Sequence, residues 1–274
     1  MADAFRCALP KEYYRQFIER DVRPDGRELG EFRPTVLNIG SISTAEGSAI
    51  VKLGNTSVIC GVKAELAEPK AETPQEGYLV PNVELSALCS SQFRPGPPGE
   101  QAQVLSQLMV NIIKNFHSVP LEDLCVVAGK LVWVLYIDLI CLDYGGNLID
   151  ACVLALTAAL KNTALPSISV EEETQKINAD ITKHNMLQLA CTPISASFAI
   201  FDNTILLVDP TSEEEALSTG TVTVVTDGEK IFEMDKSGGS QITSEQRQMC
   251  FRRAFQRHRE GIKLIEDTMS SVDR

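Results

Sequence analysis

Apolar and polar residues alternate in short runs after residue 34, and turn residues separate these runs. The runs predict strands at residues 35–41, 49–53 and 56–66. The turns at residues 45–48 and 54–55 are short, and connections of this length join antiparallel neighbours. The stretch therefore predicts an antiparallel meander. A proline-containing loop is predicted at 67–81, followed by a short strand at 85–88.

Longer apolar segments follow this meander. From about residue 100, apolar side chains recur at intervals of four, which predicts one face of a helix. These side chains are Val104, Leu108, Ile112 and Phe116. Residues 130–143 combine β-branched and aromatic side chains, so we predict a long buried strand there. The Ala- and Leu-rich residues 148–161 predict an apolar helix.

Short strands return in the last third of the chain. They are predicted at residues 187–191, 195–201, 204–208, 219–226 and 230–234. Asp202-Asn203 and Asp227-Gly228 are hairpin signals, and Thr243 can cap a final helix that runs to about residue 269. Hairpins followed by helices thus occur twice. This order predicts an α+β fold of two related β-rich halves with helices packed on the sheets.

The same pattern suggests how the chain divides. Residues 1–34, with a predicted helix at 11–20, form an N-terminal segment. Residues 35–165 form the first half, and residues 180–274 form the second half with the long C-terminal helix. The break between the halves is placed near Pro166 because proline interrupts regular structure.

Composition excludes several classes of protein. Hydrophobic residues make up 44% of the 274 residues and charged residues 23%, which is typical of a globular chain and not of a disordered or fibrous one. The most apolar run, residues 131–142, is shorter than the about 20 residues that a membrane-spanning helix needs. The N-terminus lacks the apolar core of a signal peptide. We therefore expect no membrane association.

The charge balance is acidic, with 25 Lys and Arg against 37 Asp and Glu and a net charge of -12. Such a chain is not expected to coat nucleic acid with its whole surface, although a local basic site is compatible with it. The final helix holds such a local excess of cations, which suits an RNA face, a seat for an acidic neighbour, or a solvated face. The cations are Arg247, Arg252, Arg253, Arg257, Arg259 and Lys263, against Glu245 and Glu260.

Few residues suggest cofactor or metal chemistry. The eight cysteines are dispersed without C-x-x-C spacing, and no histidine accompanies a cysteine pair at the spacing of zinc ligands. Reduced, buried thiols are therefore expected. Nucleotide-binding glycine motifs are also missing from the sequence. We expect no metal and no cofactor.

Two segments remain as candidates for function. Arg23-Pro24-Asp25-Gly26-Arg27, followed by Glu31-Phe32-Arg33, is either a turn held by ion pairs or a functional motif. Ser90–Arg94 places Gln92 and Arg94 around an aromatic residue on a loop before a helix. Such a loop can hold single-stranded nucleic acid, although a simple capped loop is the alternative.

These segments also carry a resemblance. Arg23–Arg27 with Glu31–Arg33 resembles the N-terminal signature of the RNase PH family. Further stretches fit that family in order along the chain: residues 38–41, 47–49, 52–56, 81–83 and 150–151. Residues 201–211 with Glu213-Glu214-Glu215 are similar to the non-catalytic ring subunits of the RNA exosome. The resemblance spans nearly the whole chain.

The resemblance implies an RNase PH-like fold and a ring of six such subunits around a pore that threads single-stranded RNA. In active members, phosphate attacks the 3′-terminal phosphodiester, and an Arg-containing segment at the head of a helix holds the phosphate. Here the corresponding residues 147–152 contain no Arg, and Asp150 adds a negative charge. Like charges about 4 Å apart at an effective dielectric near 20 cost about 4 kcal/mol. We therefore predict no phosphorolysis.

The resulting hypothesis is a non-catalytic structural subunit of the eukaryotic exosome ring, which supports 3′-to-5′ processing and degradation of rRNA and mRNA. Its expected partners are RNase PH-like ring subunits, RNA-binding cap subunits and single-stranded RNA, in cytoplasm, nucleus and nucleolus. Arg94 and Gln92 are expected to line the RNA path. The family motif is expected to be structural and comprises Arg23, Pro24, Asp25, Gly26 and Arg27. The alternatives are an active phosphate-dependent exoribonuclease and a small-molecule enzyme.

Overall fold

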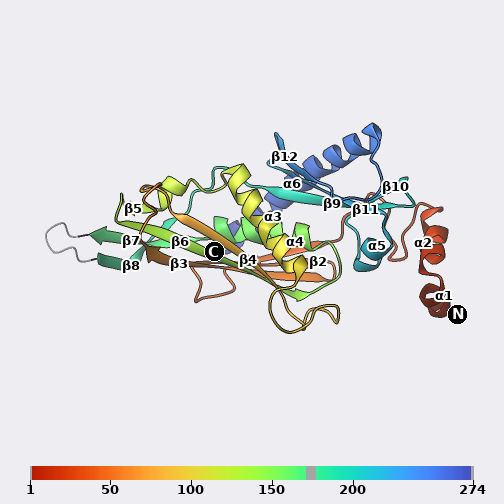
Figure 1. The fold of residues 1–274 in the computed structure, drawn as a ribbon, viewed down its shortest axis with the longest axis horizontal. Coiled ribbons are helices and arrows are strands. Elements are labelled where there is room, and N and C mark those ends of the chain that lie inside the picture. The colour runs from red at the N-terminus through yellow and green to blue at the C-terminus, as the bar shows by residue number, and fades with distance from the viewer. Residues whose placement is uncertain (1, 171–176, 273–274) are drawn as a thin grey trace.

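The computed structural model describes residues 2–170 and 177–272 and confirms the α+β class. Two sheets lie side by side with helices between and around them (Figure 1). The sheet of the first half has the strand order β1-β2-β3-β6-β4, and β5 pairs with β6 off this path. Its strands are β1 (Thr35–Ile39), β2 (Gly47–Leu53), β3 (Thr56–Ala67), β4 (Tyr78–Leu85), β5 (Cys125–Val127) and β6 (Leu131–Asp143).

The sheet of the second half has four antiparallel strands in the order β10-β9-β11-β12. These are β9 (Ile194–Phe201), β10 (Ile205–Val208), β11 (Gly220–Thr226) and β12 (Ile231–Asp235). A separate hairpin of β7 (Ala164–Val170) and β8 (Ile177–Met186) projects from one end of the molecule (Figure 1). The boundary expected between residues 165 and 180 falls partly on residues 171–176, which lie outside the described residues.

The helices cover and separate the two sheets. They are α1 (Ala2–Ala8), α2 (Pro10–Ile18), α3 (Glu100–Phe116), α4 (Leu148–Lys161), α5 (Ser212–Leu217) and α6 (Ser244–Val272), with a 3-10 turn η1 (Leu121–Leu124). Helix α4 packs against β2 and β3 of one sheet and β9 of the other. Almost all its side chains are buried, as expected for a helix between two sheets.

Strand β9 is buried along its whole length because it is covered on both faces. One face carries Ala196 and Phe198, which pack with Cys250 and Ala254 of α6. The other face carries Ser195 and Ser197, whose hydroxyls donate to Asp150 of α4. The sheet of the second half is therefore sandwiched between α6 and α4.

Several expectations about the elements were wrong. Strand β4 occupies residues 78–85 and runs parallel to β6, whereas a loop at 67–81 and a strand at 85–88 were expected. Pro81 suggested a loop, but β4 is an edge strand, where a missing N–H is tolerated. Residues 187–191 form no strand. Pro166 lies inside β7 at a register shift, so it does not end regular structure.

The prediction of which face of α3 is buried was only half right. Val104 is 61% exposed, whereas Ile112 and Phe116 are buried as expected. Each step of four residues advances about 40° beyond a full turn, so side chains spaced by four do not stay on one face of the helix. The buried side chains are Ala102, Leu105, Met109, Ile112, Ile113 and Phe116.

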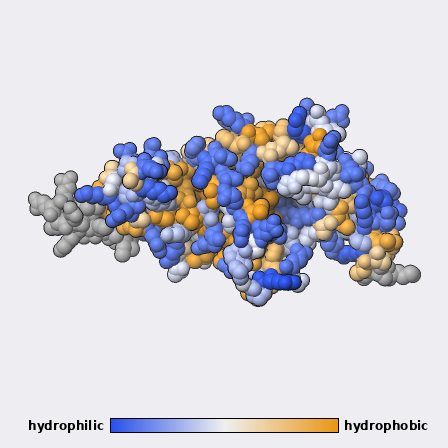
Figure 2. All heavy atoms as spheres, viewed as in Figure 1, coloured by the Kyte–Doolittle hydropathy of each residue, from blue (hydrophilic) through white to orange (hydrophobic). Residues whose placement is uncertain are grey.

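Among the described residues, no helix combines the length and the apolar character needed to cross a bilayer. The face shown in Figure 2 mixes hydrophilic and hydrophobic residues, with hydrophobic ones gathered around the middle of the molecule.

Candidate functional site

The family motif forms a tight turn that is closed by its own residues. Arg23 N donates to the Arg27 carbonyl oxygen at 2.9 Å, and Gly26 N donates back to the Arg23 carbonyl oxygen at 2.9 Å. Gly26 has φ +89°, a left-handed conformation that favours glycine. Asp25 fixes the second arginine, since its carboxylate accepts from Arg27 N at 3.1 Å and from Arg27 Nε at 2.7 Å.

Arg23 connects this turn to the second half of the chain. Arg23 is only 1% exposed, and its side chain donates to the carbonyl oxygens of Leu29 at 2.9 Å, Asp209 at 3.3 Å and Val208. Burial lowers the pKa of Arg23, and the charge of Glu214 opposes this effect. The motif residue thus lies inside the protein and does not face solvent.

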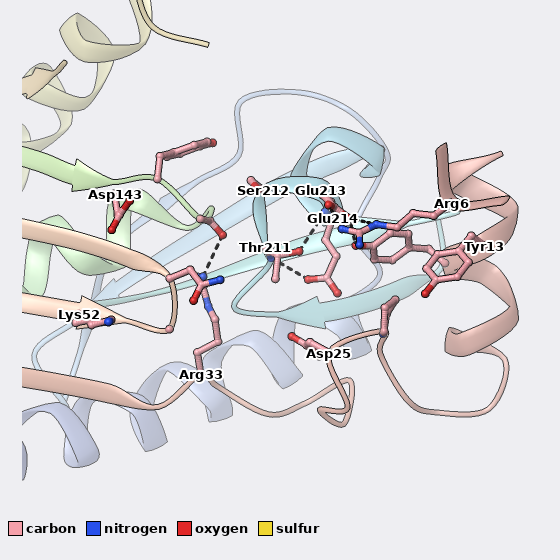
Figure 3. Close-up of a pocket in the computed structure, with 16 residues that line it drawn as sticks. Arg6, Tyr13, Asp25, Arg33, Lys52, Asp143, Thr211, Ser212, Glu213 and Glu214 are labelled. Atoms are coloured by element: carbon pink, nitrogen blue, oxygen red, sulfur yellow. Dashed lines mark hydrogen bonds and ion pairs between the residues drawn. The ribbon is translucent and has the colours of Figure 1, made fainter. Parts of the chain in front are cut away.

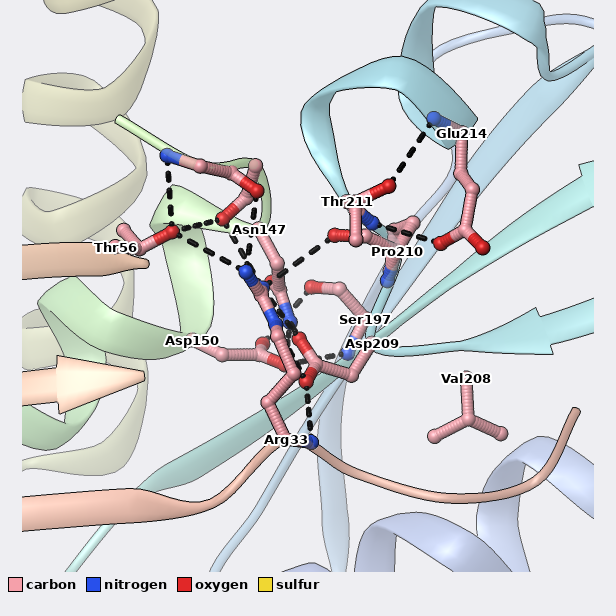
Figure 4. Close-up of polar contacts among 12 residues, drawn as sticks. Arg33, Thr56, Asn147, Asp150, Ser197, Val208, Asp209, Pro210, Thr211 and Glu214 are labelled. Carbon is pink, nitrogen blue, oxygen red and sulfur yellow. Dashed lines mark hydrogen bonds and ion pairs between the residues drawn. The ribbon is translucent and has the colours of Figure 1, made fainter. Parts of the chain in front are cut away.

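Arg33 also links the N-terminal segment to the second half, through the carboxylate of Asp209. Arg33 donates to Asp209 from Nε at 2.9 Å, from Nη2 at 2.7 Å and from its backbone N at 2.8 Å (Figure 4). Asp209 is fully buried. Burial acts to raise the pKa of Asp209, but the hydrogen bonds and charge of Arg33 outweigh it and hold that pKa below the usual 3.8. Asp209 is therefore a charged residue inside the protein.

Carboxylates gather at the head of α4. Asn147, the residue before the helix, donates from Nδ2 to Asp209 at 2.6 Å and to Asp150 at 2.7 Å (Figure 4). Its backbone N donates to Glu215 at 2.7 Å. Glu215 also accepts from the Tyr144 hydroxyl at 3.0 Å. The carboxylates of Asp150, Asp209 and Glu215 thus already accept from the side chain and the backbone N of Asn147 at this helix N-terminus.

Asp150 does not lie where we expected it. It is 4% exposed and accepts from the hydroxyls of Ser195 and Ser197, each at 2.8 Å, and from Ser197 N at 2.9 Å. Burial raises its pKa, and the donor Asn147 partly offsets this. Asp150 therefore joins α4 to β9, and the carboxylate at the accessible end of the helix is Glu215.

A cavity of about 670 Å³ borders the head of α4. Helix α4, α5 and strand β12 contribute Leu148, Glu215, Glu233 and Asp235 to its wall. Burial, together with the charge of Asp235, raises the pKa of Glu233. None of the described residues that line this cavity is a Lys or an Arg. The cavity is therefore acidic.

The loop with the RNA-path candidates reaches this cavity only in part. Gln92 lines both the acidic cavity and a neighbouring cavity of about 1140 Å³, whereas Arg94 lines only the neighbouring one. Phe93 packs edge-on against Tyr144, with ring centroids 5.5 Å apart at 79°. Phe93 thus anchors the loop to the protein. Arg94 is exposed and makes no hydrogen bond or ion pair within residues 2–170 and 177–272.

A third cavity, of about 760 Å³, lies between the N-terminal helices, the family motif and α5 (Figure 3). Arg6, Arg33 and Lys52 contribute positive charge, and acidic residues such as Glu213 contribute negative charge. Tyr14 donates to Glu213 at 2.6 Å, and Arg6 also binds this carboxylate. The mixed charges favour no particular ligand.

Sequence reasoning missed the residues that complete these sites. Glu215 lies on α5, which was not predicted, although Thr211-x-x-Glu214 is the signature of a capping box. In the structure Glu214 N donates to Thr211 Oγ1, and Thr211 N donates to Glu214. No local pattern indicated that Asp209 meets Arg33. As for metals, the described part of the chain holds no group of three or more His, Cys, Asp or Glu that could bind one.

Residues 31–166 match domain 1 of the 3′ exoribonuclease family, called RNase PH, and residues 191–257 match domain 2. The chain therefore belongs to the RNase PH family.

Among its relatives are components of exosome complexes. Exosome complex component rrp43 of Schizosaccharomyces pombe is 43% identical over 239 residues, covering 87% of this chain and 88% of that protein. Exosome complex component Rrp42 of Pyrococcus furiosus is 36% identical over 272 residues, covering 99% of this chain and 98% of that protein.

Solved structures agree with these relatives. A chain of the Archaeoglobus fulgidus exosome with RNA bound to the active site superposes with a TM-score of 0.81 at 33% identity, covering 92% of this chain and 96% of that chain. Rice Rrp46 has a TM-score of 0.68 at 15% identity and shows the shared fold alone.

Proposed function

We propose that this chain is a non-catalytic structural subunit of a eukaryotic exosome ring, at the position called exosome component eight. The similarity to rrp43 over most of both chains supports this position. Its partners would be other RNase PH-like ring subunits and RNA-binding cap subunits. It would support 3′-to-5′ processing and degradation of RNA in the cytoplasm, nucleus and nucleolus.

The acidic head of α4 carries the proposal that the subunit is non-catalytic. Phosphorolysis brings two anions together, inorganic phosphate and the RNA backbone, and needs cationic groups to stabilise them. Residues 147–152 provide no Arg, and the bordering cavity has no Lys or Arg among its described residues. Glu215 already accepts from Asn147 N. A phosphate about 4 Å from this carboxylate would meet about 4 kcal/mol of repulsion at an effective dielectric near 20.

Assembly tests the structural role. The purified chain, mixed with the other RNase PH-like ring subunits, should enter a stoichiometric six-subunit ring in size-exclusion chromatography and native mass spectrometry. Failure to enter the ring, while the remaining subunits stay soluble and folded, contradicts the proposal.

An activity assay tests whether the chain lacks phosphorolytic activity. The isolated chain, incubated with single-stranded RNA and inorganic phosphate, should release no nucleoside diphosphates. An active phosphorolytic member of the family serves as the positive control. Phosphate-dependent release by the isolated chain would establish the alternative of an active exoribonuclease.

We also propose that Arg94 and Gln92 line the RNA path of the ring. Arg94 supports this proposal because it is exposed and unpaired on a loop that Phe93 anchors. Arg94→Glu should weaken crosslinking of single-stranded RNA to the assembled ring without preventing assembly, whereas Arg20→Glu, at another exposed position, should not. Equal crosslinking by both variants rules out the role of Arg94.

A further inference from the structure

The acidic cavity at the head of α4 is a groove between helix α3 and the strands β11 and β12. Three carboxylates line it, from Glu215 of α5 and from Glu233 and Asp235 of β12. Glu233 and Asp235 are two residues apart on one strand, so their side chains point to the same face of the sheet, about 7 Å apart. Within residues 2–170 and 177–272, no ion pair joins any of these carboxylates to a cation.

Basic residues near the acidic cavity in sequence or in space belong to other contacts. Lys236 follows Asp235 directly, but its Nζ donates to the Gly238 carbonyl oxygen at 2.6 Å. Lys114 of α3 and Arg94 each line another cavity. The groove therefore has acidic residues and no Lys or Arg among its described lining residues, and its charge is of one sign.

Helix α3 forms the opposite wall of the groove, and this wall is uncharged. Val104 is 61% exposed and Leu108, one turn later, is half-buried. Gln107 and Asn111 complete the wall, and their side chains bind each other at 2.9 Å. Lysine and arginine combine an aliphatic stem with a charged head. Such a side chain fits between the two walls, with its stem on α3 and its head at the carboxylates.

Glu233 also has an acceptor that the protein leaves unpaired. Its Oε2 is shielded from solvent and accepts no hydrogen bond from the described residues. A shielded acceptor without a donor costs free energy, and the charge of the neighbouring Asp235 adds repulsion. A cationic group bound in the groove would offset both effects.

The spacing of the carboxylates favours a basic protein segment over a nucleic acid. The phosphates of RNA would meet three carboxylates and no cation. In an extended peptide, by contrast, side chains two residues apart lie on one side of the chain, about 7 Å apart. This distance matches the spacing of Glu233 and Asp235. An extended segment with cations at alternate positions can therefore pair with both carboxylates at once.

We propose that the acidic cavity binds an extended segment of a protein partner that carries Arg or Lys at alternate positions. Apolar residues of the same segment would cover Val104. All residues that form the cavity belong to this one chain. The proposal therefore does not depend on the position of the chain in a ring, nor on the role of Arg94 in binding RNA.

Peptide binding to the isolated full-length chain tests this proposal. The probe is a short fluorescent peptide in which arginine and leucine alternate, and binding is followed by fluorescence anisotropy. A control peptide of the same composition has all its arginines at one end. The alternating peptide should bind several-fold more tightly, since consecutive side chains of an extended peptide point to opposite sides.

Two pairs of substitutions locate the site. Glu233→Gln together with Asp235→Asn should weaken binding of the alternating peptide by about tenfold or more, because two charged contacts are lost. Glu266→Gln together with Asp267→Asn removes the same charge from exposed positions on α6, away from the cavity, and should leave binding nearly unchanged. Circular dichroism should show the same secondary structure for both double variants.

Several results would overturn the proposal. The alternating peptide could fail to bind, or both peptides could bind equally. An equal loss in the two double variants would indicate attraction to the net charge of -12 alone. Displacement of the peptide by an equal concentration of spermine would assign the cavity to free polyamines, and displacement by single-stranded RNA would assign it to nucleic acid.

Discussion

At the scale of single residues, the protein depends on charges buried between the N-terminal segment and the second half. Arg33 and Asp209 are 7% and 0% exposed at their side chains, and three donors of Arg33 reach this one carboxylate. A buried charge without its partner is costly, so each of these residues makes the other necessary. These buried contacts therefore link the N-terminal segment to the second half.

Removing Arg33 tests this. Arg33→Met keeps the apolar stem but removes the main cationic partner of the buried Asp209, although Arg27 lies 3.5 Å from it, and should lower the free energy of unfolding by about 3 kcal/mol. Urea unfolding measures the loss. Arg15→Met removes an exposed pair with Asp202 and should cost far less. If both variants lost a similar free energy of unfolding, the burial of the Arg33–Asp209 pair would add little to stability.

The pH dependence of stability should reveal Glu215. Burial raises its pKa above the usual 4.5, and Asn147 and Tyr144 offset this only in part. The folded state then binds a proton more tightly than the unfolded state, so stability falls as pH rises from about 4.5 through the raised pKa. Glu215→Gln removes this loss. The stability of the variant relative to the wild type should therefore increase with pH across that window, as measured by urea unfolding.

Asp202 provides a control of opposite sign. Its hydrogen bond with Lys11 lowers its pKa below 3.8, so it adds stability that is lost as pH falls through the lowered value. The stability of Asp202→Asn relative to the wild type should decrease with rising pH. If the relative stabilities of both variants changed in the same direction with pH, a raised pKa for Glu215 would be contradicted.

At the scale of elements, the turn between β6 and α4 places the two halves in contact. Gly146 has φ +90°, and a Cβ there would come within 2.2 Å of Ser212 N and 2.4 Å of the Thr211 carbonyl carbon. The first residues of α5 thus lie directly on this glycine. The glycine is needed both for its backbone conformation and for the close approach.

A pair of glycine variants separates these two requirements. Gly129 has φ +73°, and a Cβ added there would meet no atom within 4 Å, so Gly129→Ala should cost only the about 1–2 kcal/mol of a left-handed residue. Gly146→Ala adds a backbone clash and should lower the free energy of unfolding by clearly more. Urea unfolding of both variants measures the difference. Equal losses would mean that α5 shifts freely away from the turn.

The elements also show what a sequence can predict. The hairpins β1–β3 and β9–β12 and the helices α3, α4 and α6 follow from local patterns of apolar residues, because each has a face that is mainly apolar. Strand β4 was missed because its proline is tolerated only at a sheet edge, and edge positions are set by the rest of the fold. At the site, the turn of Arg23–Arg27 was visible, but the pairing of Arg33 with Asp209 joins residues far apart in sequence and leaves no local trace.

At the scale of the whole molecule, the two halves should unfold together. Helix α4 contacts both sheets, and Asp150, Asn147 and Asp209 form a buried network across them. Trp133, the single tryptophan, lies in β6 and reports on the first half, whereas far-ultraviolet circular dichroism reports on both. The two signals should give coincident urea transitions. A fluorescence transition that precedes or follows the dichroism would show that the halves unfold independently.

The β4 edge of the larger sheet bears on how readily the chain aggregates. On β4, Val83 N donates to Ser106 Oγ of α3 at 2.9 Å, and Pro81, two residues earlier on the same edge, has no N–H to offer. Another strand therefore finds no continuous row of donors there, and exposed strand edges are the usual starting point of aggregation. The β4 edge is thus a poor template for pairing with a strand of another chain, which lowers the risk of aggregation from this side of the sheet.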